Sequence, residues 1–342
     1  MRTISAAASP LRRICSTAVQ HASRRNFSSS YNLQATWGFI GLGRMGYNMA
    51  NNLRAKIPAE DTLFVHDVNT AATKTFLEEH PQGVRVADNV REVAEKAETI
   101  ITSLPEPRHV KAVFNEMLEP ATLLTDGFVN KERLFIDCST IDPMTSGEVA
   151  EAARSSGQGI FIDAPMSGGV VGAQAGTLTF MIGAAPEVVD RATAVLSLMG
   201  RRVLHLGDQG AGLKGKLANN YLLALNNIAT AEAMSMGIKW GLDPKALAGM
   251  INISTGKCWP SEVNNPVPGV IEGSPASRGY EGGFGVALAN KDLKLALKAA
   301  AEADVKLALG EPAAALYEAA ENDANCKGKD FSVVYRYLGG KE

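Results

Sequence analysis

Short apolar runs alternate with helix-forming stretches along the first two thirds of the chain. The apolar runs lie at 37–40, 62–66, 84–87, 99–103, 134–137 and 160–164. The stretches between them are predicted as helices at 44–55, 71–79, 90–96, 107–117 and 143–156. Short strands that alternate with helices predict a doubly wound parallel sheet. Two further strands, at 177–183 and 202–206, are expected to flank a helix at 187–198.

The pattern changes after Gly210, where the strand signal ends. Helices are predicted at 213–236, 244–253, 286–303, 312–325 and 331–337. The segment 254–284 is rich in Gly, Pro, Asn and Ser and is expected to be a long ordered loop. The expected fold class is therefore α/β. A doubly wound sheet would occupy residues 36–206, and an all-α C-terminal domain would occupy residues 207–340.

The first apolar run ends in the spacing Gly41-x-Gly43-x-x-Gly46, and a helix follows. Gly41 permits a tight turn, Gly43 lets the backbone approach a pyrophosphate, and Gly46 lets helix and strand pack closely. The N–H groups at the helix N-terminus attract the anion. This arrangement predicts the dinucleotide-binding turn of a Rossmann-type domain, although glycines at this spacing also occur in ordinary turns.

The second apolar run ends at Asp67, about 20 residues after the glycine turn. A carboxylate at this place accepts hydrogen bonds from the adenosine ribose hydroxyls. Because its charge would repel the 2′-phosphate of NADP, Asp67 favours NAD as the cofactor. In the alternative interpretation, Asp67 is a solvated strand-end residue that caps the helix beginning near Thr70.

Later strands bring further candidates to the same edge of the sheet. In parallel sheets the ligand lies outside the carboxyl ends of the strands. Leu104-Pro105, Ser139-Thr140 and Ser167-Gly168-Gly169 should therefore border one crevice. A serine hydroxyl and the backbone N–H groups beside two glycines suit a carboxylate. An ordinary turn would use the same three residues.

Lys216 and Asn220 stand four residues apart, so they share one face of the helix predicted at 213–236. Alanine, leucine and methionine surround them. A lysine that is removed from water has a lowered pKa, which suits general acid–base work. The alternative is a surface lysine whose stem lies along the apolar helix face.

Composition narrows the class of protein. The 342 residues carry a formal net charge of −2, which suits a globular protein of about two domains. No apolar run is long enough to span a bilayer, and no basic patch points to a nucleic acid. The cysteines have no pair spacing and indicate reduced thiols in an intracellular compartment. They are Cys15, Cys138, Cys258 and Cys326.

The first 27 residues differ from the rest. They hold five arginines among Ser, Ala and Thr, and the first acidic residue of the chain is Glu60. A positive, Ser-rich leader without acids is typical of a mitochondrial transit peptide. We therefore predict a transit peptide over residues 1–27 and residence in the mitochondrial matrix. The alternative is a disordered basic tail.

Taken together, these motifs resemble the β-hydroxyacid dehydrogenase family. The matching stretches follow the family's order and cover about residues 36–338. They lie at 38–53, 136–143, 163–170, 216–220 and 282–293. Two positions depart from the family pattern. Met166 replaces the usual valine, and His109 stands where the family more often has a small polar residue.

The resemblance implies a role for each motif. The adenosine and pyrophosphate of NAD would be held by Gly41, Leu42, Gly43, Met45, Gly46 and Asp67. The nicotinamide half would meet Leu104, Pro105 and Thr140. His109 would also contact the cofactor, and Lys291 would close on it from the C-terminal domain. Ser167, Gly168 and Gly169 would bind the substrate carboxylate. Lys216 would be the general acid–base, and Asn220 would help to place the substrate.

The resemblance also implies an activity: NAD-dependent oxidation of a short 3-hydroxy acid. The expected substrate is (S)-3-hydroxyisobutyrate, and the product is methylmalonate semialdehyde. No metal, nucleic acid or membrane takes part, and a homo-oligomer is expected, either dimer or tetramer. Two alternatives stay open. One is a related dehydrogenase or reductase of tartronate, glyoxylate or succinate semialdehyde, and the other is a cofactor-bound scaffold without catalysis.

Overall fold

The structure is a computed structural model that describes residues 34–119 and 132–342. Residues 34–342 form one compact unit. The predicted transit peptide and Cys15 lie outside the described residues. Within the described ranges, Cys138, Cys258 and Cys326 are unpaired, and no helix is both long and apolar enough to cross a membrane.

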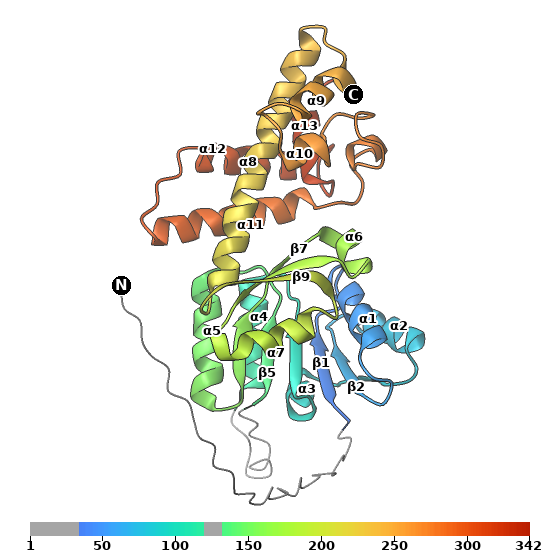
Figure 1. The fold of residues 1–342 in the computed structure, drawn as a ribbon, viewed down its shortest axis with the longest axis vertical. Helices are drawn as coiled ribbons and strands as arrows, with labels where there is room; N and C mark the ends of the chain where they lie inside the picture. Colours follow the sequence, from blue (N-terminus) through green and yellow to red (C-terminus); the bar gives the residue numbers. More distant parts are fainter. Residues whose placement is uncertain (1–33, 120–131) are drawn as a thin grey trace, which may run out of the picture. The chain divides into compact units, whose positions relative to one another are not determined.

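The described strands form one nine-stranded sheet in the order β3-β2-β1-β4-β5-β6-β8-β7, with β9 beside β8 (Figure 1). Their bounds are β1 Thr36–Ile40, β2 Thr62–His66, β3 Val84–Val86, β4 Thr99–Thr102, β5 Leu134–Asp137, β6 Ile160–Asp163, β7 Met166–Ser167, β8 Leu178–Gly183 and β9 Gly200–Gly207. Every pair from β3 to β6 is parallel. This confirms the predicted doubly wound sheet.

The far edge of the sheet differs from a purely parallel arrangement. β8 runs antiparallel to both β6 and β7, and parallel to β9. Only the short helix α6 (Gly169–Gln174) separates β7 from β8. That is too little chain for the crossover that joins parallel strands, so β8 returns in the opposite direction.

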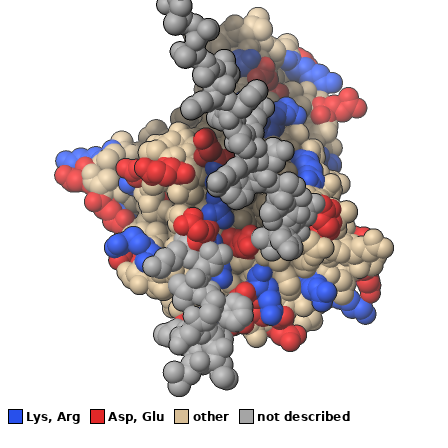
Figure 2. All heavy atoms as spheres, turned by 60° about the horizontal axis from the view of Figure 1, so that its bottom comes forward, with Lys and Arg blue, Asp and Glu red and all other residues tan. Residues whose placement is uncertain are grey.

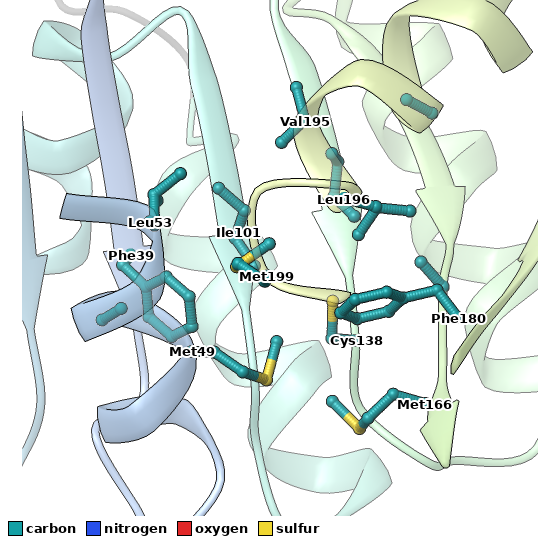
Figure 3. Close-up of a cluster of buried hydrophobic side chains, with 14 of the residues drawn as sticks. Phe39, Met49, Leu53, Ile101, Cys138, Met166, Phe180, Val195, Leu196 and Met199 are labelled. Atoms are coloured by element: carbon teal, nitrogen blue, oxygen red, sulfur yellow. The ribbon is translucent and has the colours of Figure 1, made fainter. Parts of the chain in front are cut away.

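Helices cover both faces of the sheet. The helices of this half are α1 Gly46–Lys56, α2 Thr70–Glu79, α3 Val90–Lys96, α4 Pro107–Met117, α5 Pro143–Ser156 and α7 Pro186–Leu196. One core packs α1, α2 and α7 against Phe39, Ile101 and Phe180 of the strands (Figure 3). The other packs α3, α4 and α5, where the Phe114 ring meets Phe135 and Phe161 edge-on. Because both faces are buried, the central strands are mostly apolar, and this makes them recognisable in the sequence.

Several helices begin where local chemistry predicts. Asp142 accepts a hydrogen bond from Thr145 N at 3.1 Å, and Pro143 follows it at the first helical position of α5. Asp243 caps α9 (Pro244–Asn252) in the same way, through Ala246 N at 2.8 Å. A side-chain acceptor followed by proline satisfies a free N–H at no cost to the helix.

The second half of the unit is helical. It contains α8 Ala211–Lys239, α9, α10 Trp259–Glu262, α11 Val286–Glu302, α12 Gly310–Asn322 and α13 Val334–Tyr337, with short 3₁₀ turns at Ala276–Arg278 and Phe331–Val333. The first turns of α8 pack on β8 and β9, and its later turns pack on α9, α10, α11 and α13. The expectation of a long ordered loop over 254–284 is wrong only where α10 and the 3₁₀ turn Ala276–Arg278 lie, and the rest of the segment forms turns and bends.

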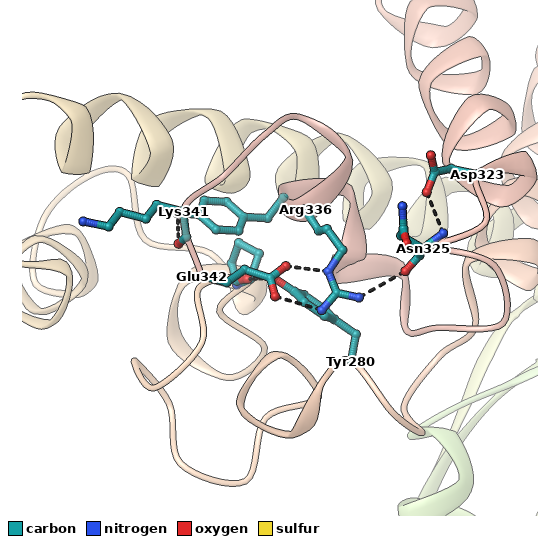
Figure 4. Close-up of polar contacts among 8 residues, drawn as sticks. Tyr280, Asp323, Asn325, Arg336, Lys341 and Glu342 are labelled. Atoms are coloured by element: carbon teal, nitrogen blue, oxygen red, sulfur yellow. Dashed lines mark hydrogen bonds and ion pairs between the residues drawn. The ribbon is translucent and has the colours of Figure 1, made fainter.

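The C-terminus is held against this helical half (Figure 4). The Arg336 guanidinium lies 4.8 Å from the Tyr280 ring centroid and pairs through two nitrogens with the Glu342 carboxylate. It also donates to Asn325 O at 3.0 Å. A planar guanidinium can satisfy a carboxylate, a carbonyl and a ring face together, so Arg336 fastens the last residues to the domain.

Charged residues are interspersed on the face that Figure 2 shows, where basic and acidic side chains of the described residues alternate.

Candidate functional site

The carboxyl ends of five adjacent strands lie in register. Ile40 pairs with His66 and with Thr102, Thr102 pairs with Asp137, and Asp137 pairs with Asp163. Each of these residues is the last of its strand. The five segments that follow therefore leave the sheet at one edge, as the predicted crevice requires.

The glycine turn occupies the first of these positions. Gly41 has a φ of +98°, and its N–H donates to His66 O at 2.9 Å. A Cβ on Gly46 would lie 1.9 Å from Gly41 O, whereas a Cβ on Gly43 would meet nothing within 4 Å. Gly41 and Gly46 are thus required by backbone packing. Gly43 is exposed and borders open space.

Asp67 lies directly beside this turn. Its Oδ2 accepts from Leu42 N at 2.6 Å, and its Oδ1 accepts from Asn69 N at 2.7 Å. The carboxylate is half-buried, so lone pairs remain for a further donor. The helix α2 is capped by Asn69 and not by Asp67. The alternative interpretation of Asp67 as a helix cap is therefore wrong.

A buried carboxylate organises the next two turns. Asp137 Oδ1 accepts from Thr102 Oγ1 at 2.7 Å and from Ser139 Oγ at 2.6 Å. Ser139 Oγ accepts in turn from Leu104 N at 2.8 Å. Burial raises the pKa of Asp137. This network joins the ends of β4 and β5 and sets the backbone at Leu104 and Thr140.

Lys291 of α11 reaches these turns from the helical half. Its ammonium donates to Thr140 O at 2.8 Å and to Pro105 O at 3.3 Å, and it pairs with Asp292 Oδ1 at 3.2 Å. Three residues predicted to contact the cofactor thus meet in space. A lysine from the second half of the chain thus contacts the turns at the carboxyl edge of the sheet.

Lys216 lies in the second turn of α8 and is only 7% exposed. Burial lowers its pKa, the charge of Asp292 raises it, and the charge of Lys291 lowers it further. Asn220, one turn later, donates from Nδ2 to Asp292 Oδ2 at 2.6 Å. Lys216, Asn220, Lys291 and Asp292 therefore form one cluster, which we call the Lys216 cluster. The alternative of a surface lysine is wrong.

The Ser167-Gly168-Gly169 turn sits between β7 and α6. Gly168 has a φ of +132° and Gly169 a φ of +62°, and both are exposed. Asn52 of α1 donates to Ala173 O at 2.8 Å, and this hydrogen bond joins α6 to α1. None of the hydrogen bonds among the described residues joins this turn to the Lys216 cluster.

Two other predicted residues are set apart from these contacts. His109 is in the first turn of α4, and its Nδ1 is buried without a hydrogen-bond partner among the described residues. Met45 precedes α1, is half-buried and packs against the core, and no side chain caps that helix.

Two contributing residues were given no role from the sequence. Asp292 and Asp163 each have contacts at this edge. The position of Asp137 at the end of one apolar run, and of Asp163 one residue before the end of the next, was a usable signal. A buried charge at a strand end must find partners in the turns that follow.

These residues fit a dinucleotide. The uncapped N-terminus of α1 carries no acidic residue in its first turn, which leaves its N–H groups for a pyrophosphate. The open space over Gly43 admits that group closely, and Asp67 offers a carboxylate to the ribose. The unpartnered nitrogen of His109 is a further polar atom on this edge.

Comparison with known proteins agrees with this geometry. A family model described as the NAD binding domain of 6-phosphogluconate dehydrogenase matches residues 36–207. A second, described as NAD-binding of NADP-dependent 3-hydroxyisobutyrate dehydrogenase, matches residues 210–338.

Individual relatives point the same way. The probable mitochondrial 3-hydroxyisobutyrate dehydrogenase of Dictyostelium discoideum is 44% identical over 89% of this chain and 90% of its own length. The mitochondrial 3-hydroxyisobutyrate dehydrogenase of Rattus norvegicus is 44% identical over 89% and 87%. A solved structure of Mycobacterium tuberculosis 3-hydroxyisobutyrate dehydrogenase with L-serine is 36% identical, with a TM-score of 0.81 over 90% of this chain and 99% of that one.

Proposed function

The chain belongs to the 3-hydroxyisobutyrate dehydrogenase family of NAD-binding oxidoreductases, and we propose that it oxidises (S)-3-hydroxyisobutyrate to methylmalonate semialdehyde in valine breakdown. The observation that carries this proposal is the Lys216 cluster. A buried lysine with a lowered pKa lies beside a lysine that contacts both turns of the nicotinamide side. Such a group can exchange a proton with an alcohol held at that edge.

NAD, when bound, would supply the redox chemistry as a hydride acceptor. Its adenosine and pyrophosphate would be held by Gly41, Leu42, Gly43, Met45, Gly46 and Asp67. Its nicotinamide half would meet Leu104, Pro105 and Thr140, with further contacts from His109 and Lys291. The Asp67 carboxylate favours NAD over NADP, because it would repel a 2′-phosphate. Lys291 donates to Thr140 O and Pro105 O and so joins α11 to the two turns on this side of the crevice.

Lys216 would accept the hydroxyl proton of the substrate at Nζ as the carbonyl forms. Its burial favours the neutral amine that can accept a proton. The Asp292 carboxylate then stabilises the ammonium, since its charge raises the pKa of Lys216. Asn220 is held by its hydrogen bond to Asp292. Its amide therefore keeps a fixed position relative to the Lys216 amine on the same helix face.

Ser167, Gly168 and Gly169 would bind the substrate carboxylate through the Ser167 hydroxyl and backbone N–H groups. The positive φ angles of both glycines give a turn that other residues rarely adopt. N–H groups that converge in such a turn form a concavity for an anion. L-serine carries the same carboxylate and a 3-hydroxyl, and we expect it to be a slower substrate.

A spectrophotometric assay of NADH formation tests the proposal. The purified protein is given NAD with (S)-3-hydroxyisobutyrate, L-serine, glycerate or 4-hydroxybutyrate, and kcat/KM is compared. (S)-3-hydroxyisobutyrate should give the highest value. A higher value with another acid would assign a different substrate, and no NADH from any of them would favour a non-catalytic scaffold.

Lys216→Met tests the assigned base. Loss of a positioned proton acceptor should lower kcat by about 10²–10⁴-fold while NAD still binds. Lys214→Met is the matched control, because Lys214 is exposed two residues earlier on the same helix. Near-normal turnover of the Lys216 variant would remove the assignment.

We further propose that the enzyme works in the mitochondrial matrix as a homo-oligomer. The relatives from Dictyostelium discoideum and Rattus norvegicus bear mitochondrial names, and the leader composition agrees. Large apolar side chains on the helical half are exposed, among them Leu222, Trp240, Met250 and Ile253. Apolar surface of this kind is commonly covered by a partner. Import of the tagged chain into isolated mitochondria and light scattering of the mature protein test the two statements.

A further inference from the structure

Asp163 is the last residue of β6 and is fully buried. Its Oδ1 accepts from Gly210 N at 2.6 Å, and its Oδ2 accepts from Leu213 N at 2.8 Å. These N–H groups belong to the start of α8, where a helix leaves its first donors without partners. One side chain of the sheet thus binds two such donors of the helix that carries Lys216.

The start of α8 is seated tightly on the sheet. A Cβ on Gly212 would lie 2.2 Å from Met181 O and 2.8 Å from Asp163 Oδ2. A Cβ on Gly183 would lie 2.4 Å from Asp163 Oδ1. Glycine at both positions lets helix and strand close around the carboxylate. The first turn of α8 therefore has no room to slide along β6 and β8.

The start of α8 is capped by a buried carboxylate, and the burial of that charge costs free energy. A serine or aspartate at the N-cap position would satisfy the helix locally, but the N-cap is Gly210, with a φ of +87° and no side chain. Burial raises the pKa of Asp163 to about 6, and the neighbouring charge of Asp137 adds to this. A local cap would stabilise α8 without fixing where it sits, whereas a cap from β6 does both.

We infer that Asp163 is a positioning residue for Lys216: it fixes the first turn of α8 on the end of β6 and so sets where the Lys216 amine lies over the carboxyl edge. Lys216 is three residues after Leu213, less than one helical turn away. A shift of that turn is passed directly to Lys216. The inference rests on the proposed acid–base role of Lys216.

The variant Asp163→Asn tests it. An asparagine oxygen can accept one of the two N–H groups, while its amide NH₂ faces the other donor. The first turn of α8 should loosen. Because misplacement of a catalytic group by about 1 Å can cost 10²-fold, kcat should fall by about 10- to 10²-fold. The Kd for NAD should stay unchanged.

A second readout needs no turnover. The whole protein, without added ligands, is labelled with acetic anhydride at a series of pH values. Mass spectrometry of the peptide that contains Lys216 then gives the reactivity and pKa of that amine. In Asp163→Asn the pKa of Lys216 should move nearer to that of an ordinary lysine, because burial is the main cause of its lowered value. Above that pKa, where the amine is neutral in both proteins, the more accessible Lys216 of the variant should label faster.

Two further variants sharpen the test. Gly212→Ala keeps the carboxylate but forces a methyl group against Met181 O, so it should change Lys216 labelling in the same direction. Asp330→Asn is the matched control. Asp330 is equally buried and binds Phe284 N and Ser332 N in the helical half. It should lower stability and leave Lys216 labelling unchanged.

The outcomes are distinct. The inference is overturned if folded Asp163→Asn matches wild type in kcat and in Lys216 labelling, or if Asp330→Asn changes the labelling equally. If Asp163→Asn does not fold, the labelling of Gly212→Ala decides. If wild type oxidises none of the 3-hydroxy acids, the proposed function fails, and the labelling still reports whether Asp163 positions Lys216.

Discussion

Asn220 donates a 2.6 Å hydrogen bond to Asp292, and this bond joins α8 to α11 within the buried cluster around Lys216. The two residues are 72 positions apart in the chain. Asp292 is also the main group whose charge raises the pKa of Lys216. The same carboxylate therefore fixes an amide that would place the substrate and adjusts the proton affinity of the proposed base.

Asp292→Asn should lower the pKa of Lys216, because it removes that negative charge and keeps an oxygen for Asn220. The oxidation requires neutral Lys216, so activity is lost as pH falls through its pKa. A lower pKa moves this acid limb of the kcat/KM profile to lower pH. Glu321→Gln is the control, since it removes a carboxylate that accepts a hydrogen bond from Asn290, which lies on α11 as Asp292 does. A shift toward higher pH would contradict the prediction.

Gly43→Ala should weaken NAD binding without changing stability. No atom lies within 4 Å of the added methyl group, so the protein should fold normally. The methyl group would enter the space through which the pyrophosphate approaches. We expect the Kd for NAD to rise about 10-fold or more, which equals ~1.4 kcal/mol. Calorimetric titration measures this.

Gly147→Ala serves as the control for that variant, because its added methyl group on α5 is equally unobstructed. It should bind NAD as wild type does. If Gly43→Ala also binds NAD normally, the phosphates do not approach over Gly43.

Asp67→Ala should raise the KM for NAD and reduce the preference for NAD over NADP. Hydrogen bonds to a charged group contribute about 1.5–3 kcal/mol each, so a KM increase of about 10- to 10²-fold is expected. The ratio of kcat/KM for the two cofactors checks the preference. Asp88→Ala is the comparison, because Asp88 is an exposed carboxylate after the neighbouring strand β3. An unchanged ratio in Asp67→Ala would assign the preference elsewhere.

Arg54→Met should destabilise the fold by about 2–4 kcal/mol. The buried guanidinium donates to Asp61 O at 2.8 Å and to Pro58 O at 2.6 Å, and these carbonyls would lose a charged donor. Unfolding in guanidinium chloride, followed by circular dichroism, gives the free energy. Arg154→Met removes an exposed guanidinium paired with Glu151 and should cost far less stability, because an exposed ion pair is screened by water. Equal losses in both variants would contradict the argument.

The features of this molecule that could be predicted are those that leave a local pattern in the sequence. The strands β1, β2, β4, β5 and β6 are mostly buried on both faces and hence mostly apolar. Asp142-Pro143 and Asp243-Pro244 begin their helices through contacts three residues away. The glycine turn and Asp67 follow from the spacing that a dinucleotide requires. These features depend on neighbours in sequence, so they could be identified without coordinates.

The direction of β8 and the helix inside the segment 254–284 were not evident, because composition alone does not distinguish an ordered loop from short helices. Asp163 gave no sign of its partners either. Its two donors, Gly210 and Leu213, are 47 and 50 residues away. Contacts at such separations depend on how the elements pack, and packing leaves no periodic signal in one sequence.

The sequence alone carries the alternation of strands and helices, a glycine turn suited to a dinucleotide and the residue types capable of acid–base chemistry. The burial of Lys216, the sharing of Asp292 by Asn220 and Lys291, and the capping of α8 by β6 emerge only from the folded structure. A side chain's chemical type is local, whereas its desolvation and its partners are set by elements that meet only when the chain has folded.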